Sequence, residues 1–410
     1  MPGQSRFFFD ETNNKKNNLS KVEKPKKFQL SNVIFISIAH FVHDTYTAFL
    51  APIVPLLKSK LGINNTMVSL LFVAQQIPNL LNPFIGIIAD NLKIRYLVIL
   101  APALTTICMS LLGVSPYYIV IVILLFVVGL SSAMFHVPTP VLIKKISGDR
   151  IGKGMSFYML GGEAARTVGP LIIVAAVDVW GLEGTFKLIP FGLLASFILY
   201  FRLRNINISN DIKDKKTYAG IKQTFKEHLP FFILITGIMF FRGFMKTSIT
   251  SFLPTYLDEK GGSLWLGGAS LSIFEFAGAI GAYLAGTFSD KIGRLRMLTI
   301  IILISPFLML GFTYSEGALM FPILLALGFF IISSTPVILA LVMDFDSEHQ
   351  AFLSGVFMFI SFVSASITNL VVGIVSDYIG LVDTYKISSI LAFLAIPFVL
   401  ILRRKYMHPN

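Results

Sequence analysis

Apolar runs of about 20 residues recur along this chain, from residue 30 to residue 402. The hydrocarbon core of a bilayer is about 30 Å thick, and a helix of roughly 20 residues crosses it. No water is available there, so each run must satisfy its backbone hydrogen bonds internally, as a helix does. The runs lack the alternation of apolar and polar residues that marks the strands of a membrane barrel. The sequence therefore predicts an all-α membrane protein.

The composition supports this class. Hydrophobic residues make up 55% of the chain and charged residues only 14%, whereas a soluble domain carries about 25% charged residues. The net charge of +12 does not indicate a nucleic-acid partner, because Lys and Arg gather in alternate loops. This asymmetry places both termini in the cytoplasm. The single cysteine, Cys108, excludes an intrachain disulfide and a cluster of thiolate metal ligands.

We expect twelve spans, near residues 30–57, 66–89, 95–114, 117–143, 153–179, 184–203, 229–257, 266–288, 297–314, 318–343, 350–376 and 383–402. A polar, Lys-rich segment separates the first six from the last six. The predicted organisation is a disordered cytoplasmic tail (1–29), a six-helix bundle (30–203), a cytoplasmic linker (204–228), a second six-helix bundle (229–403) and a short cytoplasmic tail (404–410).

The two halves repeat one another. Four pairs of landmarks share nearly one offset: Asp90 and Asp290 are 200 residues apart, as are Gln75 and Glu275, while Asp178 and Asp377 are 199 apart and Pro138 and Pro336 are 198 apart. A common offset across separate segments indicates a duplicated six-helix unit.

The loop GTFSDKIGRLR follows the eighth expected span and matches G-x-x-x-D-(K/R)-x-G-R-(K/R) at Gly286, Asp290, Lys291, Gly293 and Arg294. The first copy, GIIADNLKIR, keeps Gly86 and Asp90 but loses the second glycine. With the six-plus-six repeat, this motif resembles the major facilitator superfamily. The resemblance implies two pseudo-symmetric bundles, with the loop cluster latching them together on the cytoplasmic side. The alternative is that the loop only caps a helix and fixes the topology.

A narrower resemblance is to the fosmidomycin-resistance branch of drug exporters. It rests on His40 and Asp44 followed by LAPIVPLLK, on Phe135-His136, and on the glycines of the fifth span, Gly161-Gly162 and Gly169 before Pro170. The chain departs from that branch where Val137 separates His136 from Pro138, and where Glu163 and Arg166 carry charge.

Charged side chains lie inside the expected spans: Asp44, Glu163, Arg166, Arg242, Lys246 and Glu275. Each costs about 2.5–3.5 kcal/mol at a helix centre on insertion scales. They must therefore face one another or a wet cavity. Their helical spacing agrees, because His40, His43, Asp44 and Thr47 share one face.

Chemistry divides these residues into two groups. Arg166, Arg242 and Lys246 are cations that can hold an anionic substrate, and we add His43, Gln75 and Tyr46 to the expected substrate site. The expected proton-coupling residues are Asp44, His40, Glu163, Glu275 and His136.

Simpler roles stay open. Glu163 and Arg166 form an intrahelical ion pair in one alternative, His136 packs at a kink in another, and Glu275 anchors its helix in a third. His40, His43 and Asp44 would bind a metal only with help from another helix. We expect no metal and no cofactor.

The leading hypothesis is a proton-coupled secondary transporter that exports a small, anionic organic molecule or drug. A proton symporter that imports an organic anion is the first alternative, and a non-transporting membrane sensor is the second. We expect no enzymatic activity, because H-E-x-x-H and comparable sets are absent from the sequence. The expected partners are the small-molecule substrate, protons and the lipid bilayer. The expected setting is a multi-pass monomer in a bacterial inner membrane.

Overall fold

The computed structural model describes residues 28–82, 94–204, 220–345, 347 and 349–406, and these residues form helices and no strand. In the first half the helices are α1 (Leu30–Thr47), α2 (Leu50–Leu61), α3 (Asn65–Gln76), η1 (Ile77–Leu81), α5 (Ile94–Ser110), α6 (Tyr118–His136), α7 (Thr139–Ser147), α8 (Ile151–Trp180), η2 (Glu183–Leu188) and α9 (Ile189–Leu203). In the second half they are α10 (Ile221–Glu259), α11 (Leu264–Ile292), α12 (Arg294–Tyr314), η3 (Gly317–Leu319), α13 (Met320–Met343), α14 (Gln350–Phe393) and α15 (Ala395–Tyr406).

Within the described residues, nine helical stretches are long and apolar enough to cross a membrane, which confirms the predicted all-α membrane class. The count of twelve spans stays a prediction. The second expected span runs into residues 83–93, outside the described residues, and α5 is a shorter apolar helix. The last two expected spans lie in one stretch, Phe352–Tyr406, which Gly380 interrupts with a φ of 78°.

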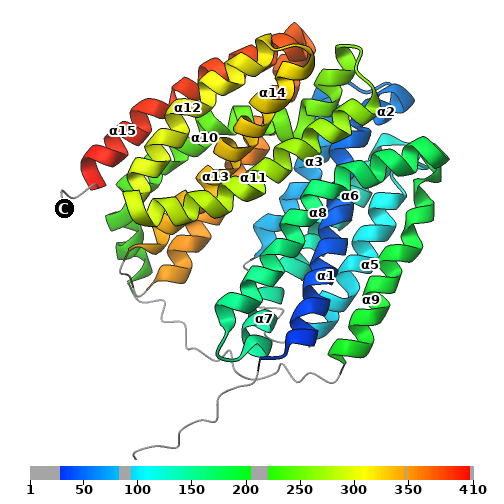
Figure 1. Cartoon of the computed structure of the whole chain (residues 1–410), viewed down its shortest axis with the longest axis horizontal. Helices are drawn as coiled ribbons and strands as arrows, with labels where there is room; N and C mark the ends of the chain where they lie inside the picture. Colours follow the sequence, from blue (N-terminus) through cyan, green and yellow to red (C-terminus); the bar gives the residue numbers. More distant parts are fainter. Residues whose placement is uncertain (1–27, 83–93, 205–219, 346, 348, 407–410) are drawn as a thin grey trace, which may run out of the picture.

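The helices form two groups that lean together at one end (Figure 1). The first group runs from α1 to α9 and the second from α10 to α15. They diverge toward the end where α1 begins and α9 ends, which we call the linker side (Figure 1). The groups meet at the opposite end, the far side, where α3 packs on α14, α2 on α10, and α8 on α11.

Polar contacts join the two halves on the far side. Lys58 pairs with Glu259 at 3.1 Å. The Asp377 carboxylate accepts the backbone N–H groups of Asn65 and Thr66, the first residues of α3, at 2.7 and 2.9 Å. Those N–H groups have no partner within their own helix, and the positive end of the helix dipole favours a carboxylate there. The far side is therefore closed by specific contacts between the halves.

Small residues let the helices of the two halves approach closely. A Cβ at Gly373 of α14 would lie 1.9 Å from the Ser69 Oγ of α3, and one at Gly268 of α11 would lie 2.7 Å from Val174 of α8. Close backbone approach at small residues is a usual means of packing helices in membranes.

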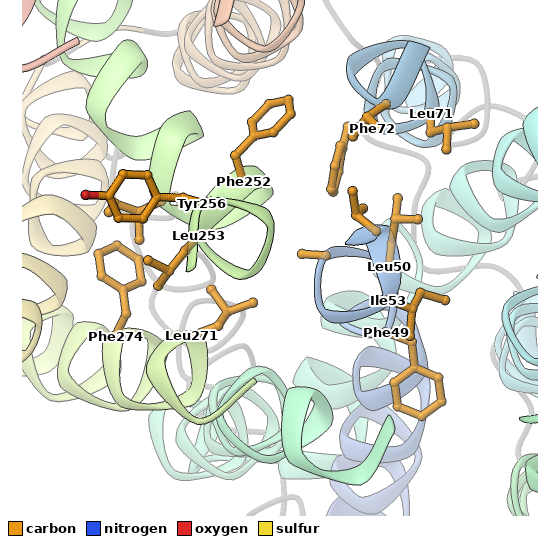
Figure 2. Close-up of a cluster of buried hydrophobic side chains, with 14 of the residues drawn as sticks. Phe49, Leu50, Ile53, Leu71, Phe72, Phe252, Leu253, Tyr256, Leu271 and Phe274 are labelled. Atoms are coloured by element: carbon orange, nitrogen blue, oxygen red, sulfur yellow. The ribbon is translucent and has the colours of Figure 1, made fainter. Parts of the chain in front are cut away.

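A cluster of buried apolar side chains also joins the two halves (Figure 2). Side chains from α2 and α3 face side chains from α10 and α11. The ring centroids of Phe72, from the first half, and Phe252, from the second half, are 6.3 Å apart. Leu50, Ile53 and Leu253 belong to the same buried cluster. We call this layer of side chains from both halves the apolar plug.

Candidate functional site

A cavity of about 160 Å³ lies between the halves, next to the apolar plug. The first half contributes Thr47, Phe72 and Arg166, and the second half contributes Thr250, Leu271 and Glu275. The cavity therefore has a cation on one wall and a carboxylate on the other, supplied by different halves.

Arg166 is the cation of the cavity. Its guanidinium forms an ion pair with Glu163, one turn earlier on α8, and its side chain is 46% exposed. Glu275 of α11 and Asp44 of α1 also act electrostatically on Arg166. The predicted intrahelical pair is thus present, yet Arg166 keeps an open face toward the cavity.

Lys246 and Arg242 lie one turn apart on α10, but their surroundings differ. Arg242 is 3% exposed, and it donates to the Ile331 carbonyl at 2.8 Å and to the Ser334 hydroxyl, both on α13. The Lys246 ammonium has no hydrogen bond or ion pair to any described residue, although Glu275 and Glu163 attract it from a distance. Lys246 is the freer cation of the two, and Arg242 is anchored.

A second polar cluster lies beside the cavity, between α1, α6 and α8. Nε2 of His40 lies 3.2 Å from one oxygen of Asp44, and Nε2 of His136 lies 3.1 Å from the other. The hydroxyl of Tyr158 is 3.2 Å from Nδ1 of His136. The structure therefore joins His136 to the predicted pair of His40 and Asp44. We call these three residues the His–Asp–His cluster.

His43 lies behind this cluster. It is fully buried, its ring stacks on Phe135, and neither ring nitrogen has a hydrogen-bond partner among the described residues. A Cβ at Gly162 of α8 would lie 2.6 Å from the ring of His40 and 3.3 Å from Asp44. Gly162 therefore allows close packing at the polar cluster, where it brings α8 against α1.

Of the six residues expected to bind substrate, Arg166 alone lines this cavity. Tyr46 and Gln75 make their contacts elsewhere. The Tyr46 hydroxyl donates to the Leu188 carbonyl at 2.6 Å, and the side chain is buried within the first half. The Gln75 amide donates weakly, at 3.5 Å, to the Thr47 carbonyl. Their expected substrate role stays a prediction, and the structure does not bring Tyr46 to the cavity.

The loop motif of the second half lies on the linker side. Gly293 has a φ of 94°, a conformation that favours glycine. Arg294 pairs with Asp290 at 3.6 Å and with Asp344 at 2.5 Å, so these contacts stay within the second half. Gly286, the first glycine of the motif, has open space around its Cα. Gly86 and Asp90, from the first copy, lie outside the described residues, as do most of the predicted N-terminal tail and linker.

Sequence reasoning missed Asp344, Asp377 and Tyr158 as contact residues. Asp344 carried a signal, because its loop reads DFDSEHQ and lacks the Lys and Arg of the other loops on its side. Asp377 stood out only as a landmark of the repeat. Tyr158 carried none, since its contacts with His40 and His136 depend on how separate helices pack together.

Comparison with known proteins gives a consistent result. A family model described as Major Facilitator Superfamily matches residues 36–368. The fosmidomycin resistance protein of Escherichia coli is 25% identical over 366 residues, covering 88% of this chain and 89% of that protein. The multi-drug resistance efflux pump PmrA of Streptococcus pneumoniae is 21% identical over 274 residues, covering 64% and 67%.

Solved structures with the same fold include a bacterial homologue of the human lysosomal transporter Spinster, inward-facing and unoccupied. It aligns with a TM-score of 0.78 at 14% identity, over 94% of this chain and 98% of that one. A D-xylose-proton symporter aligns with a TM-score of 0.72 at 14% identity, over 91% and 97%.

Proposed function

The chain belongs to the major facilitator superfamily, and we propose that it is a proton-coupled secondary transporter that moves a small organic anion by alternating access. In this proposal the linker side faces the cytoplasm, so the conformation described above opens inward. Rocking of the two halves around the cavity would expose the same site to the opposite side of the membrane.

The observation that carries the proposal is the cavity between the halves, with Arg166 on one wall and Glu275 on the other. A site shared by both halves is where alternating access requires the substrate to bind. Lys246 adds a second cation within electrostatic range of Glu275 and Arg166. A cation that keeps an exposed face, as Arg166 does, favours an anionic group, and its planar guanidinium suits a carboxylate, phosphate or phosphonate.

Export is the first candidate direction. It is supported by two relatives, a fosmidomycin resistance protein and a multi-drug efflux pump, whose names describe resistance and efflux. His40, Asp44 and His136 are among the residues on which the resemblance to the fosmidomycin-resistance branch rests, and the two histidines both contact Asp44.

Symport is the second candidate, and the electrostatics of the cavity favour it. A proton on Glu275 would remove a negative charge that opposes an incoming anion near Arg166 and Lys246. Proton and anion would then bind cooperatively, and the coupling is reciprocal. Cooperative binding drives both ligands in one direction, whereas exchange requires that they exclude one another. Glu275 is therefore our first proton-carrier candidate, ahead of Glu163, Asp44, His40 and His136.

The deciding experiment uses purified protein in vesicles with an imposed pH gradient. Organic anions, beginning with phosphonates and carboxylates, are first screened by thermal shift, and a stabilising anion is then used for flux. Export predicts that the anion moves against the direction of proton flow, and symport predicts movement with it. An absence of flux for every stabilising anion would favour the sensor alternative over both.

A further inference from the structure

The His–Asp–His cluster is built like a metal centre, and we propose that His40, Asp44 and His136 bind a divalent transition-metal ion of the zinc class. The site itself rests on the geometry of these side chains. Only its effect on transport, discussed below, rests on the proposed function. The sequence alone offered two histidines and a carboxylate on one helix, and the missing ligand from another helix is His136 of α6.

The donor atoms lie near the separations that a tetrahedral ion needs but are spread more widely, because the two short contacts go to different oxygens of Asp44. With bonds of 2.0–2.1 Å to nitrogen and oxygen, neighbouring ligand atoms lie roughly 3.3 Å apart. Nε2 of His40 and Nε2 of His136 lie 3.2 and 3.1 Å from the two Asp44 oxygens. All three donors lie within 4.8 Å of one another. The side chain of His136 is 37% exposed, so it can swing to shorten the histidine–histidine edge.

The hydrogen bonding of His40 indicates that a cation lies between its Nε2 and the Asp44 carboxylate. Nδ1 of His40 lies 2.7 Å from the Tyr158 backbone carbonyl, which can only accept, so Nδ1 carries the hydrogen. In the neutral ring, Nε2 then presents a lone pair to an ionised Asp44 oxygen 3.2 Å away. Two acceptors at that distance repel unless a proton or a metal ion lies between them. Metal-bound histidines have this arrangement, with the second ring nitrogen donating to a carbonyl.

Tyr158 orients both histidine ligands. Its carbonyl holds His40, and its hydroxyl lies 3.2 Å from Nδ1 of His136. Its ring also stacks on His40 at 4.0 Å, which fixes the plane of the imidazole. Tyr158 thus provides a hydrogen-bond partner for the second ring nitrogen of both histidines, as is usual for histidines that bind a metal.

The ligand set selects the class of ion. Two imidazoles and one carboxylate suit zinc, cobalt or nickel, whereas magnesium and calcium prefer an all-oxygen shell. Three protein ligands leave a fourth position open for water or for a substrate group. Access runs past His136, which is the only half-exposed member of the three.

An ion here would compete with protons for the same lone pairs. It would also tie α1 to α6, because Asp44 and His136 belong to different helices. If the proposed proton coupling is correct, zinc would therefore inhibit flux.

The test measures metal binding directly, without transport. Full-length protein without a histidine tag is stripped with chelator in detergent and titrated with Co²⁺, whose visible absorption reports tetrahedral coordination. We expect one Co²⁺ per chain, displaced by Zn²⁺ and not by Mg²⁺. His136→Ala should abolish the tetrahedral spectrum. Tyr158→Phe, which keeps the carbonyl, should weaken binding about 10- to 100-fold.

The matched control is His228→Ala. His228 lies on α10, and its Nδ1 donates to the Thr224 carbonyl of the same helix at 2.8 Å. This variant should bind Co²⁺ like the parent protein. A missing cobalt spectrum in the folded parent protein, or a spectrum that survives His136→Ala, would overturn the proposal and leave the cluster as a proton site. Because no flux is measured, failure of metal binding and failure of transport are separate results.

Discussion

Arg166 of α8 and Glu275 of α11 face the same cavity from opposite halves of the molecule. Neither the cation nor the carboxylate is neutralised by the other through a direct contact, since Arg166 is paired with Glu163 on its own helix. A ligand that enters the cavity therefore meets a charge from each half. Any rocking of the halves changes the distance between those two charges, which couples occupancy of the cavity to conformation.

The first prediction concerns the cations. Arg166→Ala should weaken anion binding about 10- to 150-fold, because a charge-assisted hydrogen bond contributes about 1.5–3 kcal/mol. Lys246→Ala should act in the same direction. Isothermal titration with the anion found by screening measures both. Lys222→Ala, at the exposed start of the same helix as Lys246, is the control and should bind normally. Normal affinity in both the Arg166 and the Lys246 variant would remove these two residues from the substrate site.

Arg242 should behave differently from Lys246, although both are cations on α10. Its guanidinium is anchored to α13 through Ile331 and Ser334. Truncation would leave the Ile331 carbonyl without that donor and open space in a buried site, so Arg242→Ala should lower the melting temperature as well as any binding. A comparison of thermal unfolding for the two variants separates the anchoring role from the binding role.

The second prediction concerns pH. Protonation of Glu275 removes a negative charge near Arg166 and Lys246, so anion affinity should rise as the pH falls. Glu275→Gln imitates the protonated carboxyl and should bind tightly with little pH dependence. The measurement is binding at several pH values with an anion whose own charge is fixed, such as a sulfonate. If Glu275→Gln keeps the parent's pH dependence, another group carries the proton.

The third prediction concerns the far-side closure. Asp377 accepts three hydrogen bonds at the start of α3. The donors are the backbone N–H of Asn65, the backbone N–H of Thr66 and the hydroxyl of Thr66. Asp377→Asn removes the charge and one acceptor, and should shift the conformational equilibrium toward far-side opening by about 10- to 150-fold. A cysteine placed at Ser69 in a Cys108→Ser background should then react faster with an impermeant thiol reagent.

Asp383→Asn provides the control for that experiment. Asp383 also lies on α14, but its partner is Lys386 on the same helix, at 2.9 Å. Because this pair does not cross between the halves, labelling at Ser69 should not change. Equal labelling rates in the Asp377 and Asp383 variants would mean that the Asp377 contact does not hold the far side closed.

The sequence predicted the class of fold well because its strongest signals are local. Apolar length alone indicates a membrane helix, and the offset between Asp90 and Asp290 indicates duplication without any knowledge of contacts. The comparisons confirm the family that the loop around Gly286 and Arg294 suggested. The number of spans stays a prediction, since helix breaks such as Gly380 are settled by packing rather than by hydropathy.

The site could be predicted only in part, because charge within a span indicates a polar environment and not a partner. Helical spacing correctly placed His40 beside Asp44 and Arg166 beside Glu163, which are pairs within one helix. It could not place His136 against Asp44, or anchor Arg242 to α13, because those contacts depend on how separate helices cross. The functional roles of all these residues stay predictions.

The fourth prediction uses the closest approach between the halves. An added Cβ at Gly373 would meet the Ser69 Oγ at 1.9 Å and the Asn65 carbonyl at 2.6 Å, so Gly373→Ala must push α14 away from α3. Overpacking costs about 1–3 kcal/mol, which corresponds to a roughly 5- to 150-fold shift away from far-side closure. Spin labels placed on α3 and on α14 at the far side should then show a longer distance between the two helices. Gly355→Ala, on the same helix with open space around it, is the control and should leave that distance unchanged. If Gly373→Ala also leaves it unchanged, α3 and α14 do not form the closing contact.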